Sequence, residues 1–242
     1  MSDRPSGARL GPPGPTIDVV IPARNEAPTV AAVVAAATGC AHAREVIVVD
    51  DGSADTTAER AVAAGAKVIR RQAPTGSKAH AMELGVEVSD ADAILFCDAD
   101  CLGLTSKHLD EICRPFVEGR ATMSIGWFDY GRWWNPVVLH LLPPTTGERV
   151  IPRWVWDAVP AHKRQGYSIE IMINEVIAEG HHRTTARVME GVTHRTKREK
   201  LGYVRGFRES WRMLLGLLGL PVRRVVRWRT YWFYLEKLTV ER

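Results

Sequence analysis

Short apolar runs alternate with helix-forming segments along the N-terminal part of the chain, and this alternation constrains the fold more than any other feature. We predict strands at 17–22, 45–49, 67–70 and 93–96. Helices are predicted at 30–37, from 53–57 towards 64, and at 79–88, with Thr29 as a cap and Gly65 as a terminator. Strands separated by helices imply parallel pairing through right-handed crossovers. The expected fold is α/β, with a mostly parallel, Rossmann-like sheet flanked by helices.

Polar side chains follow several of these strands at their carboxyl ends. Open parallel sheets bind ligands in the crevice beyond those ends. The residues in question are Arg24, Glu26, Asp50, Asp51, Lys78, Asp98 and Asp100. Acids and bases supplied by separate strands therefore indicate one binding crevice.

Asp98 and Asp100 follow the apolar run 93–97 and are one residue apart. If the strand continues through them, alternation places both carboxylates on the same face. Two like charges side by side repel, and a divalent cation would neutralise them. Hard oxygen ligands suit Mg²⁺ or Mn²⁺, and Mg²⁺ is often shared with substrate phosphates. The alternative is a solvated Asp-x-Asp turn.

Six segments occur in a recognisable order: 21–26, 48–57, 98–100, 147–149, 166–170 and 194–195. With them the chain resembles a nucleotide-sugar glycosyltransferase of the GT-A fold, similar to family-2 enzymes and the related glucosyl-3-phosphoglycerate synthases. The resemblance covers roughly residues 16–200. It implies a metal-dependent transfer of a sugar from a nucleoside diphosphate, with UDP favoured over GDP.

The resemblance also implies residue roles. Nucleotide-sugar binding is expected from Pro22, Ala23, Arg24, Glu26, Asp51, Ser53, Lys78, Asp98, Tyr167 and Glu170. The metal ligands would be Asp98, Asp100 and His194, and the acceptor would meet Gly147, Glu148 and Arg149. Asp100 and Glu170 are the candidate catalytic residues. Glu170 would act either as a base or on the sugar hydroxyls; the alternative is an ordinary acidic residue of a helix. The alternative for His194 is a surface histidine.

The acceptor stays unassigned. Thr145-Thr146-Gly147-Glu148 departs from the Ser-Gly-Glu loop of the synthases, which argues against a phosphoglycerate acceptor. A lipid-linked or small phosphorylated acceptor remains open. The other functional classes are a sugar-phosphate nucleotidyltransferase and a non-catalytic, membrane-associated protein of this fold. The first usually carries a Gly-rich phosphate loop, and Pro22–Glu26 stands in its place.

We expect three regions: a disordered Gly- and Pro-rich leader at 1–15, a catalytic domain at 16–200, and a helical C-terminal extension at 201–242. The leader lacks the apolar core of a signal peptide. The apolar run 211–221 is too short to span a bilayer. Arginines and aromatic residues follow it, namely Arg223, Arg224, Arg227, Trp228, Arg229 and Trp232. This mixture suits an anionic membrane surface; the alternative is packing on the catalytic domain or on a second subunit of a homodimer.

The net charge and the cysteine content are those expected of a cytoplasmic protein. The net charge is +4, and no recognisable module indicates a nucleic-acid partner. The four cysteines, Cys40, Cys97, Cys101 and Cys113, lack the paired spacing of zinc motifs and do not demand disulfides. Cys97 and Cys101 bracket the acidic motif at an interval of four. We expect buried or incidental thiols there, and the alternative is a redox or metal role. The location is therefore expected to be cytoplasmic, or peripheral on the cytoplasmic membrane face.

Overall fold

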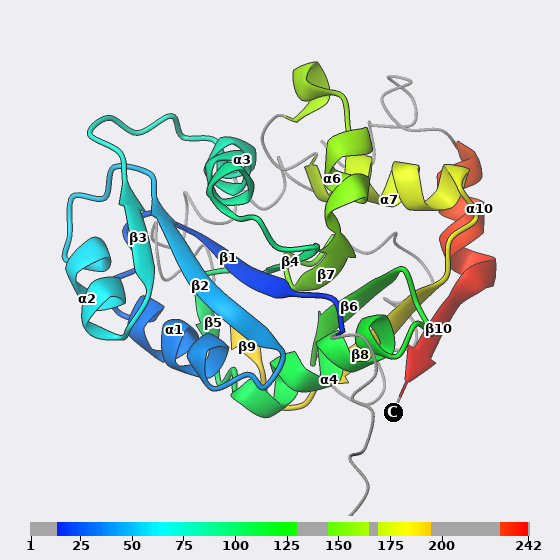
Figure 1. Cartoon of the computed structure of the whole chain (residues 1–242), viewed down its shortest axis with the longest axis horizontal. Helices are drawn as coiled ribbons and strands as arrows, with labels where there is room; N and C mark the ends of the chain where they lie inside the picture. The colour runs from blue at the N-terminus through cyan, green and yellow to red at the C-terminus, as the bar shows by residue number, and fades with distance from the viewer. Residues whose placement is uncertain (1–13, 130–144, 165–168, 195–227, 242) are drawn as a thin grey trace, which may run out of the picture.

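The computed structural model describes residues 14–129, 145–164, 169–194 and 228–241. Its centre is an eight-stranded sheet in the order β10-β8-β6-β7-β4-β1-β2-β3 (Figure 1). The strands are β1 (Ile17–Ala23), β2 (Ala43–Asp50), β3 (Lys67–Arg70), β4 (Ala93–Phe96), β6 (Met123–Phe128), β7 (Arg149–Pro152), β8 (Thr184–Met189) and β10 (Leu238–Glu241). Only β7 runs antiparallel to its two neighbours. The predicted α/β fold with a mostly parallel sheet is confirmed.

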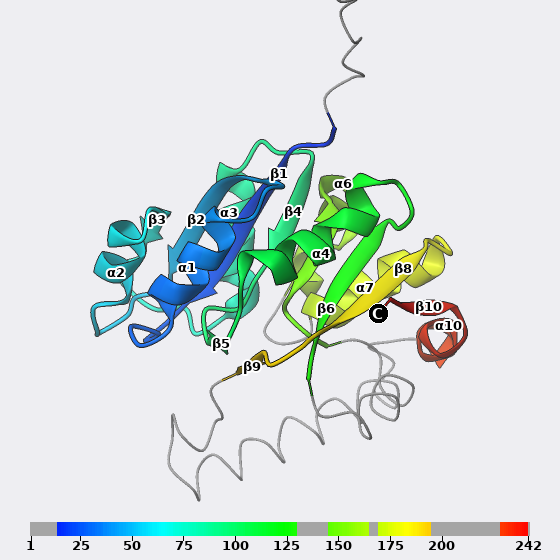
Figure 2. The ribbon, with the colours of Figure 1, turned by 90° about the horizontal axis from the view of Figure 1, so that it is seen from below.

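Helices cover both faces of the sheet (Figures 1 and 2). One apolar cluster joins the sheet to α1 (Val30–Thr38), α2 (Thr57–Ala63) and α4 (Ser106–Val117). The other joins it to α3 (Lys78–Val88), α6 (Arg153–Ala158), α7 (Ile169–Glu179) and α10 (Trp228–Lys237). The 3₁₀ turn η1 (Ala161–Lys163) follows α6. Side chains alternate along β1, because Val19 and Ile21 lie in the first cluster and Val20 in the second.

Helix α3 lies unusually close to the sheet. A Cβ atom on Gly85 would lie 2.4 Å from Cγ1 of Val20 on β1, with Val49 of β2 also in contact range. Only a glycine permits this approach. The same helix begins at Lys78, after the N-cap residue Ser77.

Three local expectations change in the structure. Thr29 occupies the N-cap position of α1, but its side chain makes no capping hydrogen bond. Strand β4 ends at Phe96, so Asp98 and Asp100 lie in the following turn and strand alternation does not apply to them. The C-terminal extension is not wholly helical, because β10 pairs in parallel with β8 at the edge of the main sheet.

Candidate active site

A pocket of about 310 Å³ lies beyond the carboxyl ends of β1, β2 and β4, beside the first turn of α3. This is the edge predicted for ligand binding in such sheets. The pocket is lined by Pro22, Ala23, Arg24, Glu26, Asp51, Gly76, Ser77, Lys78, Ala81, Asp98, Ala99 and Asp100. Eight of these residues carry roles implied by the sequence resemblance, and the structure brings those eight together.

The loop after β1 is held by side chains of the neighbouring loop after β2. Asn25 adopts a positive φ of 55°, and its N–H donates to the Ser53 hydroxyl at 2.9 Å. The N–H of Ala54 donates to Oδ1 of Asn25 at 2.9 Å. Ser53 itself donates to Asp50 and does not line the pocket. In this structure Ser53 therefore positions the pocket loops.

Asp51 holds the Thr75–Gly76 segment, which forms another part of the pocket wall. Its carboxylate accepts hydrogen bonds from the N–H and hydroxyl of Thr75 and from the N–H of Gly76, all at 2.9 Å. Burial favours a higher pKa, but these hydrogen bonds and nearby Arg71 outweigh it and lower the pKa of Asp51. The Thr75–Gly76 segment is thereby held against the end of β2.

Lys78 lies between two carboxylates. Its Nζ is 2.5 Å from Oδ1 of Asp98 and 2.8 Å from Oε1 of Glu170 on α7. Burial alone would lower the pKa of Lys78, but the two carboxylates raise it well above its ordinary value. The ammonium group is therefore a fixed positive charge that joins the acidic motif to α7.

The acidic motif Asp98–Asp100 is contacted by the loop that contains Gly147 and is followed by a short two-stranded ribbon. A Cβ atom on Gly147 would lie 2.4 Å from Oδ2 of Asp98, so this position must remain a glycine for the loop to approach the carboxylate. After Asp100 the chain forms β5 (Cys101–Leu102), which pairs with β9 (Thr193–His194) in a two-stranded ribbon. Cys101 is the register partner of His194.

This pairing brings the backbone of His194 beside the residue that follows Asp100. Among the described residues, however, the ligand atoms of Asp98, Asp100 and His194 do not gather within 4.8 Å of one another. The ring of His194 lies 5.1 Å from that of Phe128, measured between centroids, and its side chain is exposed. Two carboxylates and an imidazole form a donor set that suits Mg²⁺ or Mn²⁺.

Glu148 and Arg149, predicted to meet the acceptor, are fully buried. Oε1 of Glu148 accepts from the N–H of Asp98 at 3.2 Å, and Oε2 accepts from the Thr146 hydroxyl at 2.6 Å. Burial, aided by the charge of Asp98, raises the pKa of Glu148 to about 7. In this structure Glu148 supports the acidic motif from behind and does not line the pocket.

Arg149 connects the same loop to α7. Its guanidinium donates to the carbonyl of Glu170 at 3.1 Å, to Oδ1 of Asn174 at 3.0 Å and to the carbonyl of Thr146. Burial lowers the pKa of Arg149. An acceptor role for its side chain would require these bonds to change.

Sequence reasoning missed part of the pocket wall, namely Gly76, Ser77, Ala81 and Ala99. Ser77 caps α3 by accepting from the N–H of His80. A Thr-Gly-Ser run before a helix is a recognisable start signal that could have identified this segment. Tyr167 lies outside the described residues, as do Arg223, Arg224 and Arg227 of the basic segment.

A family model described as glycosyl transferase family 2 matches residues 18–163. The glucosyl-3-phosphoglycerate synthase of Mycolicibacterium smegmatis is 39% identical over 112 residues, which cover 43% of this chain and 37% of that protein. The aligned segment thus spans little more than a third of this curated relative.

Crystal structures of the Mycobacterium tuberculosis glucosyl-3-phosphoglycerate synthase are also similar. The complex with Mg²⁺ and uridine diphosphate has a TM-score of 0.63 at 25% identity, covering 75% of this chain and 72% of that one. The complex with Mn²⁺, uridine diphosphate and phosphoglyceric acid has a TM-score of 0.62 at 25% identity, covering 75% and 71%. Among the described residues of the present chain, no helix has the length and apolarity needed to cross a membrane.

Proposed function

This chain belongs to glycosyl transferase family 2, and we propose that it transfers a sugar from a UDP-sugar to a small phosphorylated acceptor in a metal-dependent reaction. The observation that carries the proposal is the pocket in which Asp98, Asp100 and Lys78 meet beyond the carboxyl ends of the strands. Such a mixture of charges fits a diphosphate bridged to the protein by a cation and contacted directly by an ammonium group.

The chemistry places negative charge on the departing diphosphate as the bond to the sugar breaks. Lys78 is a positive charge already held in position by Asp98 and Glu170, so it can stabilise that charge with little reorganisation. Asp98, Asp100 and His194 would hold Mg²⁺ or Mn²⁺, which when bound supplies Lewis-acid stabilisation of the phosphate oxygens.

We consider two roles for Glu170, and binding of the UDP-sugar donor does not distinguish between them. Its side chain is 4% exposed and accepts a hydrogen bond from Lys78 at 2.8 Å. As an ion-pair partner it positions Lys78. As a base it would have to reach an acceptor hydroxyl, and Glu170 is the candidate base only if the reaction inverts the sugar configuration.

The acceptor class is inferred from the relatives. One similar structure holds phosphoglyceric acid together with uridine diphosphate. A small acceptor with a phosphate or carboxylate is therefore the first class to test, and phosphoglycerate belongs in that panel despite the different loop sequence at 145–148.

The deciding experiment is calorimetric titration of UDP- and GDP-sugars with Mn²⁺ and with EDTA, followed by turnover assays with phosphorylated acceptors. We expect UDP-sugar binding that needs Mn²⁺ and is lost in Asp98→Ala, while the exposed-surface variant Asp157→Ala binds as the wild type does. Absence of binding to every donor would overturn the enzyme proposal and favour a non-catalytic protein. Release of pyrophosphate from a nucleoside triphosphate and a sugar phosphate would identify a nucleotidyltransferase instead.

Peripheral membrane attachment remains a separate proposal from the sequence, because most of the basic segment lies outside the described residues. Co-sedimentation with vesicles containing anionic lipid, compared with neutral vesicles, tests it. Binding to neither vesicle would remove the lipid-surface proposal without affecting the pocket.

A further inference from the structure

A second cluster of metal-binding side chains lies behind the acidic motif, on the side away from the carboxylates that serve the pocket. We propose that Cys97, Cys101 and Glu148 form a site for a thiophilic divalent cation, Zn²⁺ in the first instance. This site is separate from the Mg²⁺ or Mn²⁺ site proposed at Asp98 and Asp100, and it does not depend on the glycosyltransferase proposal.

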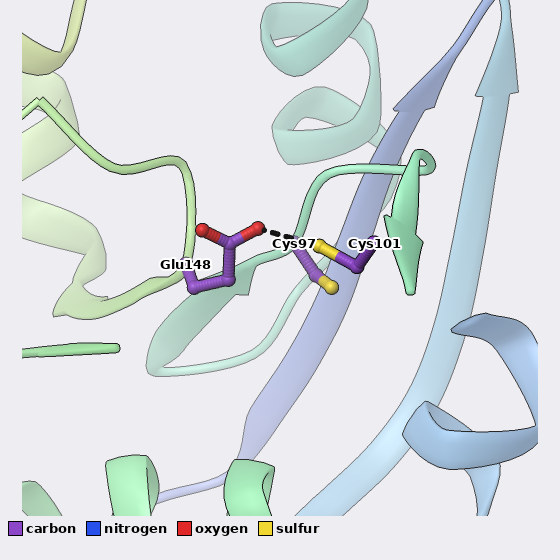
Figure 3. A group of neighbouring side chains, drawn as sticks. All are labelled: Cys97, Cys101 and Glu148. Carbon is purple, nitrogen blue, oxygen red and sulfur yellow. Dashed lines mark hydrogen bonds between the residues drawn. The ribbon is translucent and has the colours of Figure 1, made fainter. Parts of the chain in front are cut away.

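The geometry of the three side chains supports a common ligand. One ligand atom from each, two sulfurs and a carboxylate oxygen, lie within 4.8 Å of one another. Sγ of Cys101 is 3.0 Å from Oε1 of Glu148. Figure 3 shows the Glu148 carboxylate directed toward the Cys101 sulfur, with Cys97 beside them. Ligands around a tetrahedral zinc ion are separated by roughly 3.7 Å, so small side-chain movements suffice.

The chemistry of the ligands selects the ion. Thiolates bind Zn²⁺ and other soft ions in preference to Mg²⁺ and Mn²⁺, whereas Asp98 and Asp100 offer only hard oxygens. Three protein ligands with a fourth position for water is a known zinc arrangement. Cys97 and Cys101 are a single pair with three residues between them, so they lack the two-pair spacing that identifies a zinc motif in sequence, and the third ligand has to come from elsewhere in the fold.

The third ligand could not be identified from the sequence. Glu148 is 47 residues from Cys101 along the chain and is brought to it only by the pairing of β7 with β4. Its carboxylate is already oriented by the N–H of Asp98 and the hydroxyl of Thr146. Such preorganisation by neighbouring groups is typical of metal-ligating carboxylates.

The cluster is closed to solvent in this structure. The three side chains are buried, at 0%, 2% and 0% exposure for Cys97, Cys101 and Glu148. The segment 98–100 between the two cysteines lines the pocket, so this segment separates the pocket from the sulfurs and would have to move for an ion to enter. On binding, each coordinated sulfur forms a bond to the ion and its proton passes to the buffer.

The test uses the full chain purified without metal, with Cd²⁺ as a spectroscopic probe and Zn²⁺ as its competitor. We expect sulfur-to-cadmium charge-transfer absorption that saturates at one equivalent and is displaced by Zn²⁺. The absorption should be lost in Cys97→Ser and Cys101→Ser and weakened in Glu148→Gln. Cys40 and Cys113, two other buried free cysteines, provide matched controls, and Cys40→Ser and Cys113→Ser should keep the absorption.

Two outcomes would overturn the proposal. One is wild-type protein that shows no thiolate absorption with Cd²⁺. The other is absorption that survives in Cys97→Ser and Cys101→Ser but disappears in the Cys40 or Cys113 variants. Asp98→Asn should keep the absorption, because the acidic site does not supply the sulfurs. If the serine variants do not fold, X-ray absorption of the zinc-loaded wild type decides: two sulfur neighbours support the site, and an all-oxygen or nitrogen shell refutes it.

Discussion

Lys78 is the residue on which the charges of the pocket converge, because one ammonium group contacts carboxylates from two separate elements. Removing it would leave Asp98 and the buried Glu170 without their common partner. It would also remove the positive charge available to a leaving diphosphate.

Lys78→Met should therefore reduce kcat with the preferred UDP-sugar by about 10²-fold, the usual effect of losing one preorganised electrostatic group. Lys107→Met is the control, since the Lys107 side chain is 82% exposed. Equal turnover in the two variants would show that Lys78 has no electrostatic role in the reaction.

Asp51 should make stability depend on acid pH. The hydrogen bonds from Thr75 and Gly76 lower its pKa in the folded state below the ordinary value of 3.8. The stabilisation is thus complete above that value and is lost as pH falls through the folded pKa. Asp51→Asn should be less stable than wild type near pH 7, with the difference narrowing toward about pH 2.

Urea unfolding across this pH range measures the free energy of unfolding of both proteins. Asp157→Asn, at the exposed surface, controls for the loss of one negative charge. A difference between wild type and Asp51→Asn that stays constant with pH would contradict the hydrogen-bonded carboxylate described here.

At the scale of elements, α3 connects core packing to the pocket. Gly85 allows the helix to lie against β1, and the same helix begins at Lys78. Gly85→Ala should destabilise the protein by roughly 1–3 kcal/mol, the usual cost of overpacking. The control is Glu87→Ala on the exposed side of α3. Thermal unfolding measures both, and an unchanged melting temperature for Gly85→Ala would show that the helix can shift at no cost.

Elements with a strong local pattern could be predicted from the sequence, and those that depend on distant partners could not. The strands β1, β2 and β4 could be predicted from their apolar runs. Eight of the expected site residues line the pocket. Strand β7 has only four residues, and its position between β4 and β6 follows from pairing across the sheet. The burial of Glu148 depends on that pairing and could not be read from the sequence, and its acceptor role stays a prediction.

At the scale of the whole molecule, the C-terminal residues are joined to the helix that carries Glu170. Tyr234 on α10 is 3% exposed, and its hydroxyl donates to the carbonyl of Asn174 on α7 at 3.1 Å. Helix α10 therefore packs against the helix that carries Glu170. Most of the basic segment before α10 lies outside the described residues.

Tyr234→Ala should lower the free energy of unfolding by about 3–5 kcal/mol, as for other buried aromatic side chains. Tyr234→Phe should cost only about 1 kcal/mol, because it loses the hydrogen bond alone. Trp232→Ala is the matched control on the same helix, since Trp232 is 63% exposed. Equal effects of the two alanine substitutions would mean that α10 does not pack as described.

The position of β7 has a mechanical consequence. Among the strands of the main sheet, β7 alone joins the half formed by β3, β2, β1 and β4 to the half formed by β6, β8 and β10. It is four residues long, so few backbone hydrogen bonds hold the two halves in register. We expect any relative rotation of the halves to strain this strand, which begins directly after Glu148. Amide exchange along β7, compared with that of the neighbouring interior strand β4, would report such motion.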